Sequence, residues 1–168
     1  MKKSLLFALC AIIVLFATCK KPVDPPVIDY SLNYLGSYLG NFTLTVTSMN
    51  NQPQSAMSFS IDSIGMDITK GAETNAIMVS MTIENEPYHI TGTASADKVT
   101  FTPVHLTLDK SDFSIVCDIH LEGEPIENGI FNIKGDFSGN GSANIMGQVQ
   151  TFDEVSGTVE GKLQKLLQ

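Results

Sequence analysis

The sequence predicts an all-β fold, an antiparallel barrel or sandwich of about eight to ten short strands, with an up-and-down barrel as the favoured form. Three observations predict it. From residue 41 onward, apolar and polar side chains alternate with a period of two, as along strands that bury one face. Residues typical of turns separate these runs roughly every 8–12 residues. No long stretch repeats its apolar residues at the helical period.

The first eighteen residues have the composition of an export signal. Two lysines precede the apolar run 5–16, and the small residues Ala17 and Thr18 follow it. This order is typical of a cleaved signal peptide, and the apolar run is too short for a membrane-spanning helix. We therefore expect residues 1–18 to be removed on export.

Cys19 directly follows the small residues, and this arrangement resembles the lipobox of bacterial lipoproteins. The resemblance implies that Cys19 is acylated and anchors the mature chain in the bacterial cell envelope, with the outer membrane as the expected membrane. Residues 19–33 then form a linker, in which three prolines favour an extended spacer. Lys20-Lys21 stand where surface-exported lipoproteins of some Gram-negative gut bacteria carry acidic residues. This mildly favours the periplasmic face, but the sequence leaves the face undecided.

The composition excludes several classes of function. Residues 34–168 have the length of one domain, which can bury a core without a metal or a disulfide. All ten basic residues are lysines, and the net charge is −8. An acidic chain without arginine is poorly suited to nucleic acid and to bidentate binding of phosphate or carboxylate ligands. We therefore expect no nucleic-acid partner.

The expected strands follow one another along the domain. At Pro103 the alternation slips by one residue, which predicts a bulge or a corner because proline cannot donate to a ladder. Cys117 is in phase with its apolar neighbours, so we expect a buried residue rather than a reactive thiol.

The apolar runs that we expect to form strands are 42–46, 57–61, 64–68, 77–83, 99–101, 104–108, 113–121, 131–133, 143–149 and 155–163. The turn signals lie at 50–53, 70–71, 85–87, 122–123, 128–129 and 139–141.

Gly36-Ser37-Tyr38 precedes the first strand, at the place where lipocalins carry Gly-x-Trp. With the lipobox, the linker and the meander of strands, it resembles the calycin-like (lipocalin-like) barrel lipoproteins of Gram-negative bacteria. The resemblance implies a barrel over residues 34–168 with Tyr38 as a packing residue at its base. The chain has no tryptophan, and no arginine to cap that ring from the last strand, so it departs from orthodox lipocalins.

Small residues on the inward phase of the last two strands suggest an apolar cavity. A barrel of this size encloses a space that side chains just fill, or that holds one small ligand. Methionines on other strands could adapt to an irregular apolar shape. The predicted pocket wall consists of Gly92, Ala143, Gly147, Gly157, Gly161, Met57, Met66 and Met81. The alternative is that opposing phenylalanines fill the space, and the sequence leaves both open.

No combination of residues marks a catalytic or metal site. His89, His105 and His120 lack the spacing of metal ligands. Asp136-x-Ser138-x-Asn140-Gly141 partly matches the start of a calcium loop, but the twelfth position is Gly147, which favours a hairpin turn. No serine lies in a nucleophile elbow and no phosphate loop is present. We expect no enzyme activity, no cofactor and no metal.

These features predict a lipid-anchored envelope barrel that binds a small apolar or amphipathic ligand, or an envelope partner. Two alternatives stay open: a structural or inhibitor-like domain with a filled core, and an accessory protein that acts on sugars. We expect the membrane as a partner, through Cys19, and a monomer. Asp62-Ser63-Ile64 also matches a short O-glycosylation signal of some gut bacteria, which makes Ser63 a candidate for modification.

Overall fold

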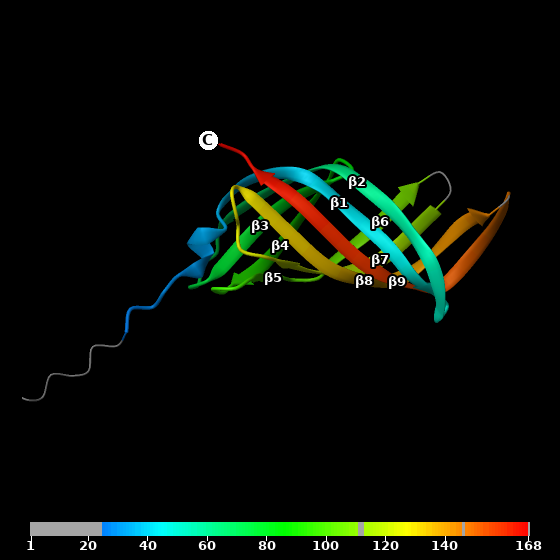
Figure 1. The fold of residues 1–168 in the computed structure, drawn as a ribbon, viewed down its shortest axis with the longest axis horizontal. Helices are drawn as coiled ribbons and strands as arrows, with labels where there is room; N and C mark the ends of the chain where they lie inside the picture. The colour runs from blue at the N-terminus through cyan, green and yellow to red at the C-terminus, as the bar shows by residue number, and fades with distance from the viewer. Residues whose placement is uncertain (1–24, 111–112, 146, 168) are drawn as a thin grey trace, which may run out of the picture.

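The computed structural model describes residues 25–110, 113–145 and 147–167, and Figure 1 shows their fold. One short 3-10 helix precedes nine strands. The elements are η1 (Tyr30–Asn33), β1 (Gly36–Met49), β2 (Gln52–Lys70), β3 (Ala76–Ile83), β4 (Glu86–Ala94), β5 (Val99–Phe101), β6 (Val104–Lys110), β7 (Phe113–Gly123), β8 (Ile130–Ile145) and β9 (Gln148–Lys165). In the described part of the chain, no helix is long and apolar enough to cross a membrane. The expected signal peptide and Cys19 lie outside the described residues.

The strands form one antiparallel sheet that closes into an up-and-down barrel, as predicted. Their order is β5-β4-β3-β2-β1-β9-β8-β7-β6, and β5 also pairs with β7. Because β5 and β6 both lie along β7, they are two parts of one strand that is interrupted at Thr102-Pro103. This interruption confirms the irregularity predicted at Pro103, where the ladder loses an N–H donor.

Burial follows the alternation of the sequence. β3, for example, buries every second side chain and exposes the residues between them. The buried residues form a single apolar core inside the barrel, and Cys117 belongs to it. Burial raises the pKa of the Cys117 thiol to about 11, so this cysteine is a packing residue, as predicted.

Three hairpin turns lie where the sequence predicted them. Asn50 and Asn51 both have positive φ, and so do Glu84 and Asn85, and Asn128 and Gly129. Two consecutive residues of this kind form the type I′ turn, whose twist matches that of paired strands. Asparagine and glycine tolerate this backbone conformation best, and therefore the turn signals were informative.

Four parts of the strand prediction are wrong. The run 143–149 is not one strand, because β8 ends at Ile145 and β9 begins at Gln148. Gly139–Gly141 is not a turn, because β8 continues through it with a register shift against β9. The runs 57–61 and 64–68 are one strand, β2, in which Ser63 adopts a φ of 59° at a bulge. The sequence runs also omitted β4, whose apolar alternation is weak in its first half. In each case the pairing across strands overrides the local pattern.

The base of the barrel, where η1 lies, is closed by aromatic side chains. Tyr38 is 1% exposed, and its ring centroid lies 5.4 Å from that of Phe131. The Tyr38 hydroxyl donates to the carbonyl oxygen of Tyr34 at 2.5 Å. The interpretation of Tyr38 as a packing residue at the base is therefore confirmed.

A lysine stands over this ring. The Nζ of Lys165, in the last strand, lies 5.8 Å from the centroid of the Tyr38 ring, within the range of a cation–π contact. A Cβ at Gly36 would lie 2.7 Å from the Lys165 side chain, so the glycine leaves the space that this side chain needs. Lys165 therefore supplies a cation over the Tyr38 ring from the last strand.

Tyr38→Phe is expected to make stability less sensitive to alkaline pH. Burial raises the pKa of Tyr38 to about 12, whereas the unfolded chain ionises near 10. The stability that the neutral Tyr38 hydroxyl contributes is therefore fully present below pH 10 and is lost as the pH rises towards 12. Denaturant midpoints measured from pH 9 to 12 should fall less steeply for Tyr38→Phe than for the wild type. Equal slopes would contradict the assignment.

Candidate functional site

The end of the barrel opposite η1 is not fully closed by strand pairing. Within the described residues, β3 pairs with β2 only from Gly65 onward, and β6 pairs only with β7. The first half of β2 and the whole of β6 therefore each have one unpaired edge. Between them the shorter β3–β4 hairpin ends at Ile83 and Glu86. We call this end the mouth.

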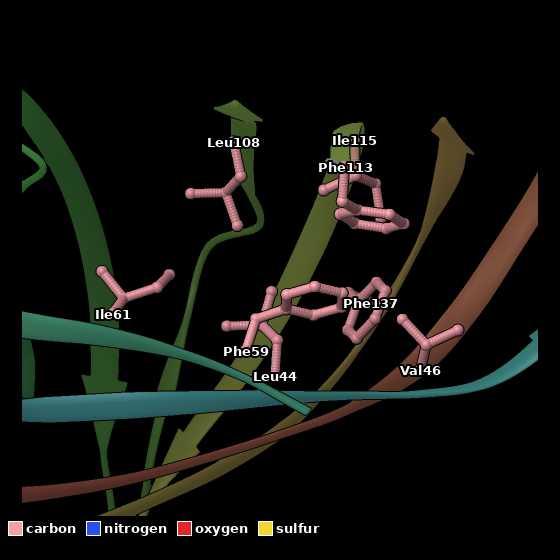
Figure 2. A pocket seen from close by; sticks show the side chains of 8 residues that line it. All are labelled: Leu44, Val46, Phe59, Ile61, Leu108, Phe113, Ile115 and Phe137. Carbon is pink, nitrogen blue, oxygen red and sulfur yellow. The ribbon is translucent and has the colours of Figure 1, made fainter. Parts of the chain in front are cut away.

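An apolar slot lies inside the mouth (Figure 2). Its walls come from β1, β2, β6, β7 and β8, and every lining side chain is a hydrocarbon. The free space inside it is about 10 Å³, close to the minimum that holds one water molecule. The lining residues are Leu44, Val46, Phe59, Ile61, Leu108, Phe113, Ile115 and Phe137.

Two phenylalanines meet across the slot. Phe59 of β2 stacks on Phe113 of β7, with ring centroids 4.4 Å apart and an interplanar angle of 15°. Phe59 is half-buried, and Phe113 is 6% exposed. Both phenylalanines face inward, although Phe59 lies at the rim rather than deep in the core. The slot is lined only by hydrocarbon side chains, so its lining offers contacts to an apolar group but no proton donor, proton acceptor or metal ligand.

The predicted pocket wall does not form this slot. Four of its small residues lie opposite phenylalanines on neighbouring strands: the pairs are Gly92–Phe101, Ala143–Phe113, Gly157–Phe137 and Gly161–Phe42. A Cβ at Gly157 would lie 2.7 Å from the Phe137 ring, and one at Gly161 would overlap the Phe42 ring. Here phenylalanines fill the space beside the glycines, which is the alternative that the sequence left open.

The remaining residues of the predicted wall are distributed over three places. Met66 and Met81 are buried and pair across β2 and β3, as their phase predicted. Met57 pairs with the buried Val46 and lies on the inner face of β2, but it is 41% exposed near the mouth and is therefore not part of an enclosed wall. Gly147 lies in the exposed β8–β9 turn with a φ of 81°, and nothing lies within 4 Å of a Cβ placed there. A turn needs its conformational freedom, so the small size of Gly147 does not indicate a cavity.

None of the eight residues that line the slot was predicted as pocket wall, and Phe137 is the one that lay outside every predicted strand. The expected turn at 139–141 ended the preceding run at residue 133 and left Phe137 outside any strand. The available signal was the continued alternation of Phe131, Ile133 and Phe137 along β8. Glycines interrupt this alternation, and only the cross-strand pairing shows that they belong to the same strand.

The histidines form separate surface pairs. His105 lies 2.9 Å from Asp118, and His120 lies 3.1 Å from Asp136, measured between Nδ1 and Oδ1. The third, His89, contacts a serine hydroxyl. All three are exposed, and no group of three or more metal-ligating side chains occurs in the described residues. Asp136, Ser138 and Asn140 lie along the outer face of β8, so they do not form the loop that a calcium site would need.

The two predicted modification sites have different outcomes. Ser63 is exposed on the β2 bulge, so its hydroxyl is accessible. Cys19 lies outside the described residues, and its acylation stays a prediction.

Comparison with known proteins shows little similarity. No protein-family model matches the chain, and no curated protein matches it. Among solved structures, it is similar to a protein of unknown function from the DUF3598 family of Nostoc punctiforme, with 11% identity and a TM-score of 0.39. The match covers 83% of this chain and 50% of that protein, so the chain spans half the length of its neighbour.

Proposed function

We propose that this protein is a lipid-anchored, calycin-like barrel of the bacterial cell envelope that binds the apolar part of a small amphipathic ligand at its mouth. The observation that carries the proposal is the slot, which is lined only by hydrocarbon side chains and lies where two strand edges are unpaired. Sites for small molecules are typically concave and mostly apolar. The run of residues before Cys19 supports the anchor and the envelope location.

Binding at the slot requires Phe59 to move. The existing free space of about 10 Å³ is too small for any organic ligand. Phe59 is half-buried and belongs to the part of β2 that has one unpaired edge, so less packing holds it than holds Phe113. Separating the two rings would admit an acyl chain or an aromatic ring. The polar part of such a ligand would stay in solvent, since no lining side chain can bind it.

Phe59→Ala is expected to strengthen binding of an apolar naphthylamine dye several-fold, because the alanine removes the ring that fills the slot beside Phe113. Fluorescence titration of wild type and variant measures this. The matched control is Phe152→Ala, since Phe152 is another half-buried phenylalanine, on β9, outside the slot. The proposal fails if neither the wild type nor Phe59→Ala binds the dye, or if Phe152→Ala strengthens binding equally.

The second candidate is a domain with a filled core that acts through an envelope partner. The phenylalanines packed beside Gly157 and Gly161 favour it, since they leave no ligand space in those parts of the barrel. The unpaired edges of β2 and β6 offer backbone N–H and C=O groups to which an extended segment of another protein could pair. Absence of dye binding in both the wild type and Phe59→Ala would favour this candidate.

Cys19→Ala is expected to release the protein from membrane fractions, because acyl chains on that cysteine would be its anchor. Intact-mass measurement of the wild type should show the added acyl groups, and the variant should lack them. A membrane-bound Cys19→Ala protein, or a wild-type mass without acyl groups, would contradict the proposed anchor. Cys117→Ala serves as the control, because Cys117 is buried in the core.

A further inference from the structure

Exposed apolar side chains gather at the base of the barrel. Among the described residues, five of the nine exposed large apolar side chains belong to the segments that enter and leave the barrel at this end, and a sixth, Leu39, lies near the start of β1. Figure 1 shows η1 and the C-terminal segment at the same end. We call these six the base patch: Val27, Ile28, Leu32, Leu39, Leu166 and Leu167. Water-exposed apolar groups gathered at one end of a domain indicate an interaction surface.

The entering segment is fixed to the barrel. The backbone N–H of Tyr30 donates to the side-chain oxygen of Asn75 at 2.7 Å. Asp29 forms an ion pair with Lys70 of β2, and its carboxylate also accepts from the backbone N–H of Asn75 at 3.1 Å. These contacts hold η1 in place, so the exposure of Leu32, at 59%, is a property of the fold.

The leaving segment is fixed beside it. The backbone N–H of Leu166 donates to the carbonyl oxygen of Ser37 at 2.8 Å. Leu166 and Leu167 line a surface hollow together with Leu35, which lies in the short connection between η1 and β1. The leaving segment therefore lies beside the connection through which the entering segment joins the barrel.

The position of Cys19 indicates what covers this surface. Cys19 precedes Val27 by eight residues, and a fully extended chain of that length spans at most about 29 Å. We propose that the base patch docks onto the lipid bilayer, so that the mouth faces away from the membrane. This inference rests on the proposed anchor at Cys19. The anchor would raise the local concentration of bilayer at the patch, so that weak apolar contacts suffice.

The charges at the base favour apolar docking over electrostatic docking. The loops at this end carry three exposed carboxylates, Glu73, Asp97 and Glu127, against one exposed lysine, Lys98, which is paired with Glu122. These carboxylates would be repelled by anionic headgroups, so we expect docking onto zwitterionic lipid with little dependence on salt. Apolar side chains that enter the boundary between headgroups and acyl chains supply the attraction.

Tryptophan fluorescence can test this directly, since the chain contains no tryptophan. Leu32→Trp and Leu167→Trp place a probe in the base patch. Val149→Trp is the matched control, because Val149 is 72% exposed and lies in the β8–β9 hairpin at the opposite end. Each variant is expressed from the full chain, purified from membranes and reconstituted into phosphatidylcholine vesicles whose acyl chains carry bromine, a quencher of tryptophan. We expect at least about twofold quenching at positions 32 and 167, and none at 149.

The outcomes separate the docking from the anchor. Acylated, vesicle-bound protein in which positions 32 and 167 are quenched no more than 149 would overturn the docking and leave the anchor standing. If the mass shows no acyl groups, the anchor fails, and coupling the Cys19 thiol to a maleimide lipid still allows the same quenching measurement. Blue-shifted emission at positions 32 and 167 without vesicles, together with a dimer mass, would show that a second copy covers the patch and would also overturn the docking.

Discussion

Phe131→Ala is expected to lower the free energy of unfolding by about 3–5 kcal/mol, as the loss of a fully buried phenylalanine does. Phe131 has no exposed surface. Its ring centroid lies 5.8 Å from that of Tyr34, 5.4 Å from Tyr38 and 6.4 Å from Phe101. The ring is thus the centre of the aromatic cluster that closes the base.

The cavity left by Phe131→Ala has little chance to collapse. A Cβ placed on Gly123 would overlap the Phe131 ring, so the backbone of β7 packs directly on it. Backbone held in a ladder cannot move inward as a flexible side chain can, and the cost of a large-to-small change rises with the cavity that persists. Denaturant melts would measure the change in unfolding free energy.

Thr45→Ala is the control for this measurement. Thr45 is only partly buried, and its hydroxyl shares a 3.0 Å hydrogen bond with Ser58 on the outer face. Its loss should cost less than about 1 kcal/mol, as for surface substitutions generally. If Phe131→Ala and Thr45→Ala lowered the free energy of unfolding equally, the proposed role of the aromatic cluster at the base would be contradicted.

Gly157→Leu is expected to prevent folding, and Gly157→Ala to cost about 1–3 kcal/mol or more. A Cβ at this position would overlap the carbonyl oxygen of Thr45 on β1 and would lie 2.7 Å from the Phe137 ring. The first obstacle is backbone, which gives way only if the β1–β9 ladder shifts. A leucine here would therefore not fill a cavity, as the predicted pocket wall would have allowed.

Gly65→Ala is the matched control for the Gly157 variants. Gly65 also lies inside a strand, β2, but nothing lies within 4 Å of a Cβ built there. Its alanine variant should keep the wild-type unfolding midpoint to within about 0.5 kcal/mol or gain stability through the smaller entropy of the unfolded chain. Circular dichroism and denaturant melts compare the two positions. Equal unfolding free energies for Gly157→Ala and Gly65→Ala would show that Gly157 is not packed as described.

The alternation along the sequence determined which face of most strands is buried. Side chains of a strand point to opposite faces in turn, so burial can be assigned without knowing which strands are neighbours. The interruption at Pro103 and the asparagine turns could also be predicted from residue type alone, since proline lacks an N–H and asparagine tolerates positive φ. The barrel class and the burial of Cys117 followed from these local properties.

Which side chains meet inside the barrel was decided only by the tertiary structure. Register places Phe137 opposite Gly157 and Phe42 opposite Gly161, and bulges at Ser63 and 139–141 change that register within single strands. A glycine in a strand has the same local signature whether a cavity or an aromatic ring from the next strand lies beside it. The apolar slot is therefore at the mouth, where the first half of β2 and the whole of β6 lack a second neighbour, and not at the glycine-rich wall. Strand pairing joins residues far apart in the chain, and no local pattern records it.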